Sequence, residues 1–85
     1  MMEKNVRVEN SHGLHARPAA EFVKRASGFS SDIRVRYKEK EANAKSILNI
    51  LSLGIDQGAE VTLLADGADS QDAVDQLATL LGSGA

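Results

Sequence analysis

Apolar residues in this chain recur alternately at every second position and at every third or fourth position. This change of period constrains the fold more than any other feature of the sequence. A period of two is typical of a strand with one buried face, and a period of 3.6 is typical of an amphipathic helix. Segments of both kinds follow one another closely within 85 residues. A chain of this length has room for one core, so we expect a single domain over residues 1–85.

Four segments are predicted to be strands. In the first, Val6 and Val8 alternate with charged residues, and the last is the most apolar of the four. The second and third are expected to form a hairpin, although the turn between them, Lys38–Lys40, lacks the usual glycine or asparagine. The predicted strands are Lys4–Glu9, Ile33–Tyr37, Glu41–Asn43 and Glu60–Ala65.

Three segments are predicted to be helices. The first covers 16–27, with Pro18 in the first turn, where its missing N–H is not needed. The second is capped by Ser46 and stops at Gly54. The last begins after Asp69 or Ser70. The apolar stripe expected on the first helix consists of Ala16, Ala19, Ala20, Val23 and Ala26.

The resulting order is β-α-β-β-α-β-α. Polar residues alternate with apolar ones on three of the strands, which indicates a sheet with one face under helices and one face in water. We therefore predict an α+β fold, an open-faced β-sandwich with a four-stranded antiparallel sheet and three helices on one face.

Composition excludes several classes of function. The chain has no cysteine, so disulfides, thiolate metal sites and cysteine nucleophiles are absent. Its net charge of −2 does not favour nucleic acid or anionic membranes. No apolar run approaches the roughly 20 residues of a membrane span, and residues 1–6 lack the apolar core of a signal peptide. We expect a cytoplasmic protein that does not insert into membranes and needs no cofactor or metal.

The two histidines bracket Gly13–Leu14, directly before the first predicted helix. At such a helix terminus the first backbone N–H groups, here those of Ala16 and Arg17, lack intrahelical partners, and the Arg17 guanidinium adds a full positive charge. This combination suits a phosphate group. A neutral imidazole is also a nucleophile near pH 7, so His15 could accept a phosphoryl group directly.

Two other interpretations of the histidines remain open at this point. His15 could be a surface residue that caps the helix and does nothing more. His12 and His15 could also bind a metal, together with Glu9 or Glu21. The metal site is disfavoured, because Gly13 breaks helical spacing and the further ligands do not obviously converge.

Three blocks of the sequence resemble one known family. They are Gly13–Ala20, Asn43–Leu48, and the stretch that contains Leu51–Gly54, Gly58 and Val61–Leu63. The chain is similar over nearly its whole length to HPr, the histidine-containing phosphocarrier family of the bacterial phosphoenolpyruvate:sugar phosphotransferase system. The resemblance implies a phosphoryl carrier, not an enzyme, that works as a monomer.

The family resemblance also implies roles for individual residues. His15 would receive a phosphoryl group on Nδ1 from phosphorylated enzyme I and pass it to EIIA domains of sugar permeases, with Arg17 as its charge partner. Ser46 would be the serine modified by HPr kinase/phosphorylase in bacteria that have that enzyme. Ile47, Leu48 and Leu51 would form a small exposed apolar patch, whereas Ile50 is expected in the core. The implied docking surface consists of Ala16, Arg17, Ala20 and Lys24 on the first helix with Lys45, Ile47, Leu48 and Leu51 on the second.

Some residues depart from the family pattern. His12 stands where threonine or asparagine is commoner, so a second titratable ring lies close to His15 in the sequence. Leu48 and Leu51 replace methionines of Gram-positive members, which weakens the expectation of a catabolite-repressor partner.

Two alternative functions are compatible with the sequence. One is a regulatory or nitrogen-branch paralogue that acts mainly through protein–protein interaction, although the retained histidine favours a working carrier. The other is a small nucleic-acid-binding module that uses Arg7, Arg34, Arg36 and Lys38 on an open sheet face. That module needs stacking aromatic residues on the same face, and Tyr37 has the parity of the buried side. A solvated sheet face with no nucleic-acid partner is the favoured interpretation.

Overall fold

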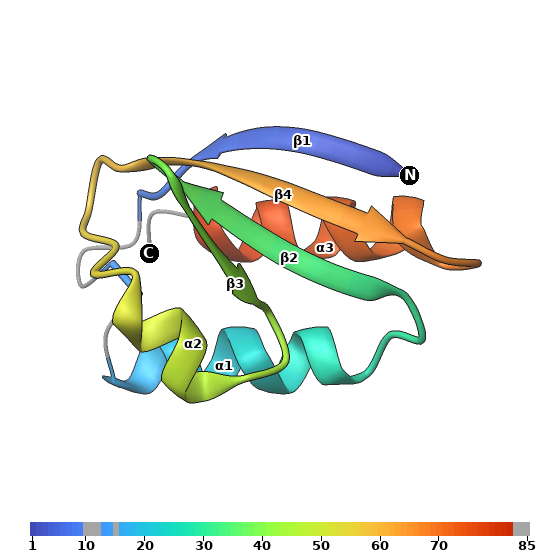
Figure 1. Cartoon of the computed structure of the whole chain (residues 1–85), viewed down its shortest axis with the longest axis horizontal. Coiled ribbons are helices and arrows are strands. Elements are labelled where there is room, and N and C mark those ends of the chain that lie inside the picture. Colours follow the sequence, from blue (N-terminus) through green and yellow to red (C-terminus); the bar gives the residue numbers. More distant parts are fainter. Residues whose placement is uncertain (10–12, 15, 83–85) are drawn as a thin grey trace.

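The computed structural model describes residues 1–9, 13–14 and 16–82 of the chain. Its elements follow the predicted order β-α-β-β-α-β-α and form the predicted α+β fold (Figure 1). Helix α1 has the predicted bounds, and the other elements lie within a few residues of theirs. The elements are β1 (Met2–Arg7), α1 (Ala16–Ser27), β2 (Asp32–Tyr37), β3 (Lys40–Asn43), α2 (Ile47–Ser52), β4 (Glu60–Asp66) and α3 (Ser70–Gly82).

The strands form one antiparallel sheet in the order β1-β4-β2-β3. Strand β4 lies in the centre between β1 and β2, which are consequently parallel to each other and joined through α1. The three helices cover one face of this sheet, as Figure 1 shows, and the other face is open. The predicted open-faced sandwich is confirmed.

The first strand differs from its predicted range, 4–9. It begins at Met2, which pairs with Ala65 of β4, and its regular ladder ends at Arg7 opposite Glu60. Val8 then turns inward and is fully buried, and its N–H donates to the carbonyl of Ala59 at 2.8 Å. The alternation of apolar and charged residues predicted that Val8 belongs to the strand. In the structure the next residue, Glu9, already forms a backbone hydrogen bond to α3.

The core lies between the sheet and the helices and contains apolar residues from every helix and from β2, β3 and β4. Part of the stripe predicted on α1 is wrong. Ala19 and Ala26 are buried as expected, but Ala20 is exposed and Phe22 is completely buried. Neighbouring alanines have the same hydropathy, so the sequence does not say which of them faces the sheet. Phe22 fixes the orientation because it has the largest side chain to bury.

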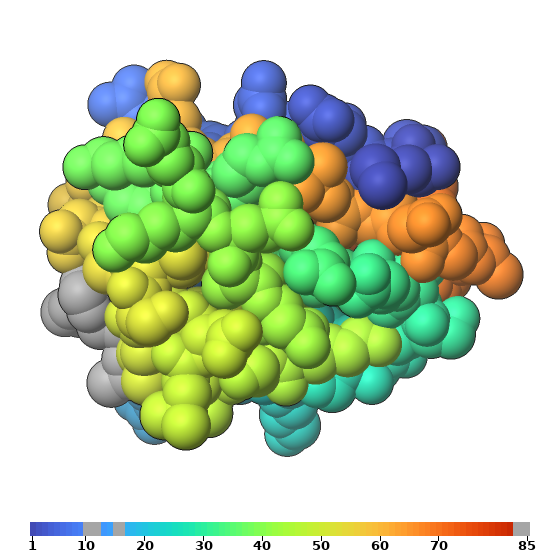
Figure 2. Space-filling view, viewed as in Figure 1, coloured from blue at the N-terminus to red at the C-terminus, as the bar shows by residue number. Residues whose placement is uncertain are grey.

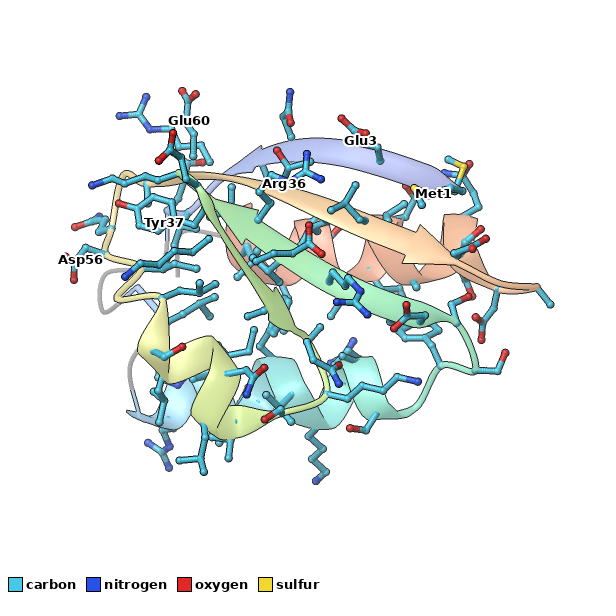
Figure 3. The ribbon with its side chains drawn as sticks, in the orientation of Figure 1. Met1, Glu3, Arg36, Tyr37, Asp56 and Glu60 are labelled. Atoms are coloured by element: carbon cyan, nitrogen blue, oxygen red, sulfur yellow. The ribbon has the colours of Figure 1, made fainter. Side chains whose placement is uncertain are left out.

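The predicted β2–β3 hairpin is confirmed. Tyr37 pairs with Lys40, which leaves a two-residue turn of Lys38 and Glu39. Lys38 has a φ of 57° and so occupies the left-handed position that glycine or asparagine usually fills. Its ammonium lies 5.2 Å from the centre of the Tyr37 ring. Figure 3 shows Tyr37 and Asp56 at the same end of the molecule and Met1 at the other.

Candidate functional site

The chain is anchored to the core immediately before the first helix. Leu14 is 1% exposed, and its N–H donates to the carbonyl of Ile55 at 2.9 Å. Gly13 is buried with a φ of 59°. A Cβ at Gly13 would collide with the carbonyl oxygen of Ile55 and lie 2.7 Å from the Cα of Asp56. Only glycine therefore fits at this contact between the segment before α1 and the segment after α2.

His12 and His15, the two candidate reacting histidines, lie outside the described residues. The backbone next to His15 is nevertheless defined on both sides. Leu14 precedes it and is fixed by its buried side chain and its bond to Ile55. Ala16 follows it and is the first residue of α1. In the sequence, His15 therefore stands between a rigid anchor and a helix N-terminus.

The first turn of α1 carries positive charge and no acidic residue. The amides of Ala16 and Arg17 belong to the group of N–H donors that a helix leaves without intrahelical acceptors. Arg17 is exposed, and the helix dipole adds a partial positive charge at the same terminus. This end of α1 is therefore electropositive and open to solvent, which suits a phosphoryl group.

Helices α1 and α2 pack against each other and run in opposite directions, so the segment after α2 reaches the start of α1 (Figure 1). On α1 the predicted docking residues Arg17, Ala20 and Lys24 are all exposed. Ala16 of the same predicted surface is the first helical residue. This surface of α1 therefore carries two basic side chains with one small side chain between them.

Helix α2 contributes the apolar part of the predicted docking surface. Leu48 is 76% exposed and Leu51 is 38% exposed, whereas Ile50 is completely buried as predicted. Ile47 was expected to be exposed with them, but it is half-buried and packs against the core. In Figure 2, α2 forms part of the molecule's outer surface, next to residues of α1. The exposed apolar patch therefore consists of two leucines.

Lys45 and Ser46 lie at the start of α2, away from the anchor at Gly13. Ser46 is the predicted N-cap: its hydroxyl accepts the N–H of Asn49 at 3.4 Å, and its own backbone is extended. Lys45 is half-buried, and its ammonium donates to the carbonyl of Phe29 at 2.7 Å. The sequence placed Lys45 among the docking charges and contained no sign of this bond.

A second residue that the sequence did not single out lies near the other end of α1. The carboxylate of Asp69 accepts the N–H groups of Ser30 and Ser31 at 2.9 and 3.0 Å and the hydroxyl of Ser31. These bonds, that of the Ser31 hydroxyl first, lower the pKa of Asp69 to about 2. The sequence placed Asp69 only near the start of the last helix and did not indicate these bonds, because the serines are 38 and 39 residues away.

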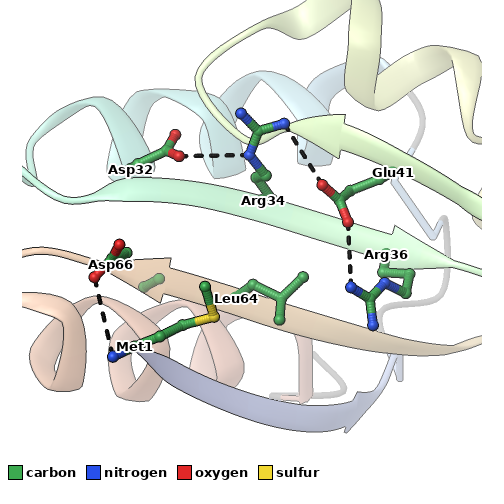
Figure 4. Close-up of a pocket in the computed structure, with 8 residues that line it drawn as sticks. Met1, Asp32, Arg34, Arg36, Glu41, Leu64 and Asp66 are labelled. Atoms are coloured by element: carbon green, nitrogen blue, oxygen red, sulfur yellow. Dashed lines mark hydrogen bonds and ion pairs between the residues drawn. The ribbon is translucent and has the colours of Figure 1, made fainter.

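The open sheet face gives no support to nucleic-acid binding. A pocket of about 240 Å³ lies there, and Leu64 is among the residues that line it (Figure 4). Arg34 pairs with Asp32 and Glu41 at 3.4 and 3.5 Å, and Arg36 pairs with Glu41 at 3.3 Å. Two of the basic residues that suggested such a partner are therefore neutralised within the sheet.

Neither a metal cluster nor a membrane span is found in the part of the chain that the structure describes. Within those ranges no three histidine, cysteine, aspartate or glutamate side chains converge well enough to hold a metal ion. None of the helices there has the length and apolar character needed to cross a bilayer.

Comparison with known proteins decides the family. The family model described as the phosphotransferase system HPr component phosphorylation site matches residues 2–83. The chain belongs to the HPr family. It is 43% identical over 81 residues to the phosphocarrier protein HPr of Buchnera aphidicola subsp. Acyrthosiphon pisum. The aligned residues cover 95% of each chain.

Two crystal structures of HPr proteins are also close in fold. HPr-C-His from Thermoanaerobacter tengcongensis is 49% identical with a TM-score of 0.92, covering 95% of this chain and 91% of that one. HPr from Bacillus anthracis is 41% identical with a TM-score of 0.93, covering 94% and 95%. As predicted, the chain is thus a phosphocarrier in the relay of the phosphotransferase system rather than an enzyme.

Proposed function

We propose that His15 is the residue that carries the phosphoryl group, between phosphorylated enzyme I and EIIA domains of sugar permeases. Nδ1 of His15 attacks the phosphorus, a P–N bond forms, and the bond to enzyme I breaks. The reverse exchange transfers the group to EIIA. The observation that carries this proposal is the anchor at Gly13 and Leu14, which fixes the backbone directly before His15 at the electropositive start of α1.

The first turn of α1 supplies the groups that hold the phosphoryl oxygens. The amides of Ala16 and Arg17 donate hydrogen bonds, and the Arg17 guanidinium adds a charged donor. These donors act on the carrier state and on the transition states of both transfers. Apart from the P–N bond formed at His15, the contribution of the chain to the chemistry is positioning and charge.

Partner proteins are proposed to dock on the exposed residues of α1 and α2 described above. Leu48 and Leu51 supply apolar contact area, and Arg17 and Lys24 match acidic groups on the partner. Ser46 is proposed as a regulatory phosphorylation site for HPr kinase/phosphorylase, where the chain's host has that enzyme. The chain works as a monomeric single domain in the cytoplasm, where these partners act.

Labelling with enzyme I and phosphoenolpyruvate tests the proposal. The wild-type chain is expected to accept one phosphoryl group, in an acid-labile and base-stable form, and His15→Ala is expected to accept none while it stays folded. The matched control is His12→Asn, which should transfer within about tenfold of wild type, a barrier change under ~1.4 kcal/mol. Normal labelling of His15→Ala would show the assignment to be wrong. Labelling only by the nitrogen-branch enzyme I would place the chain among the regulatory paralogues.

A further inference from the structure

The ammonium of Lys45 is committed to a bond within the molecule. It donates to the carbonyl of Phe29 at 2.7 Å, and Lys45 is half-buried. By contrast, Lys24 and Arg17 are exposed, and neither forms a hydrogen bond or ion pair with another described residue. Lys45 therefore differs from the other cations of the docking surface, because a partner could use its charge only after this bond was broken.

The position of this bond gives it a structural role. Phe29 follows the last turn of α1, and Lys45 precedes the N-cap of α2. Among the hydrogen bonds of the described residues, it is the one that joins these two segments. The opposite ends of the two helices are joined by the bond from the Leu14 N–H to the Ile55 carbonyl. The helix pair is thus held at both ends, by a backbone bond at one and by a lysine at the other.

We propose that Lys45 is a positioning residue, which sets the spacing of α1 and α2 and so the docking surface, and that a phosphate on Ser46 would compete for its ammonium. The inference rests on the proposed docking and Ser46 modification. Ser46 is the next residue in the chain and the N-cap of α2, so a phosphate there would add negative charge beside Lys45. An ammonium binds a phosphate oxygen more strongly than a neutral carbonyl, because both partners are charged. The phosphorylated chain would then lose the tie between Lys45 and Phe29.

The salt dependence of docking separates this role from that of a docking charge. Removing a docking charge weakens the salt dependence of KM for enzyme I, and the defect fades at high salt. The control Lys24→Met is expected to behave in this way. Lys45→Met is expected to raise KM about fivefold, the equivalent of one ordinary hydrogen bond, with kcat and the salt dependence unchanged. Lys45→Arg, which can still donate to the carbonyl, should restore part of the loss.

Two outcomes would overturn the positioning role. If Lys45→Met lost its defect at high salt as Lys24→Met does, Lys45 would be a docking charge. If Lys45→Met lowered the unfolding temperature without changing KM, the bond would be structural only. A failure of the carrier function itself looks different, because the wild-type chain would then not be labelled at all.

The carbonyl ¹³C shift of Phe29, measured by NMR, tests the competition without any partner protein. Lys45→Met is expected to move this signal, because the carbonyl loses its donor. Phosphorylation of Ser46 in the wild-type chain should move it in the same direction, and phosphorylation of the Lys45→Met variant should add nothing. A Phe29 signal that stays in place when Ser46 is phosphorylated would contradict the competition.

Discussion

The two ends of α1 are held by different kinds of interaction. At the start, backbone contacts fix the chain: Gly13 lies against Ile55, and the Leu14 N–H bonds to the same residue. At the end, charged side chains from other segments hold the loop that follows α1. Asp69 accepts the amides of Ser30 and Ser31, and Lys45 donates to Phe29.

This difference agrees with the proposed roles of the two ends of α1, because a phosphoryl group is expected only at its start. A backbone anchor contains no titratable group, so it leaves the electropositive helix start available for a phosphoryl group at any physiological pH. At the far end Asp69 stays ionised near neutral pH, because its pKa is about 2. We therefore expect substitutions at the start of α1 to impair transfer and substitution of Asp69 at its end to impair stability. Lys45 is the exception at that end, because it also positions the docking surface and is expected to change KM.

Apart from the loss of His15 itself, the largest effect is expected from Gly13→Ala, which would force Ile55 and Asp56 away from the segment before His15. Phosphotransfer from enzyme I should fall at least about tenfold, ~1.4 kcal/mol in the barrier. Gly54→Ala is the matched control, because Gly54 also has a positive φ, of 64°, but a Cβ there would meet nothing within 4 Å. Equal transfer rates for the two variants, measured by rapid-quench labelling, would show that backbone strain and not the collision matters.

A smaller effect on the same function is expected from changes at Arg17. Arg17→Lys keeps the charge but loses the planar fork of donors, so transfer should slow several-fold. Arg17→Ala should slow it further, and neither change should alter the unfolding temperature, since the side chain is exposed. Full transfer rates in Arg17→Ala would remove Arg17 from the site.

The smallest effect on transfer, and a clear one on stability, is expected from Asp69→Asn. The folded state lowers the pKa of this carboxyl from 3.8 to about 2, so the ionised form stabilises the fold. That contribution is present above about pH 4 and is lost as the pH falls toward 2. Urea unfolding at pH 7 should show a destabilised Asp69→Asn variant, with a weaker loss of stability between pH 4 and pH 2 than wild type.

Two outcomes would contradict this assignment. One is an Asp69→Asn variant as stable as wild type at pH 7, and the other is a variant that keeps the wild-type pH dependence. If Asp69→Asn also reduced the transfer rate as much as Gly13→Ala, the proposed difference between the two ends of α1 would not hold. Ser31→Ala, which removes the first of the bonds to Asp69, provides a check and should show the same changes to a smaller extent.

Most of the fold could be predicted because its signals are local. Pro18 lies in the first turn of α1, and Ser46 caps α2 by accepting the N–H of a residue three positions away. The interactions that the sequence did not reveal all join distant segments. Lys45 and Phe29 are 16 residues apart, and Asp69 and Ser31 are 38 apart. An aspartate before a helix has an obvious local role as a cap, so nothing in the sequence indicated that its carboxylate bonds elsewhere.

The candidate site stays a prediction, but the sequence signals that indicate it are also local. Its residues are close in sequence, and the chemistry of a histidine beside free amides and an arginine follows from that proximity. The contact that anchors the segment before α1 could not be predicted from the sequence. The Leu14 N–H bonds to the backbone carbonyl of Ile55, and every residue type has such a carbonyl, so no side-chain pattern indicates this contact.

The most direct test of the account is to locate the phosphoryl group on the phosphorylated chain by ¹⁵N and ³¹P NMR. The chain would be labelled with ¹⁵N at histidine and phosphorylated by enzyme I and phosphoenolpyruvate. We expect a single phosphoramidate, with a one-bond coupling between phosphorus and Nδ1 of His15, and an unmodified His12 ring. A phosphoryl group found on His12, or on any residue other than His15, would contradict the central claim.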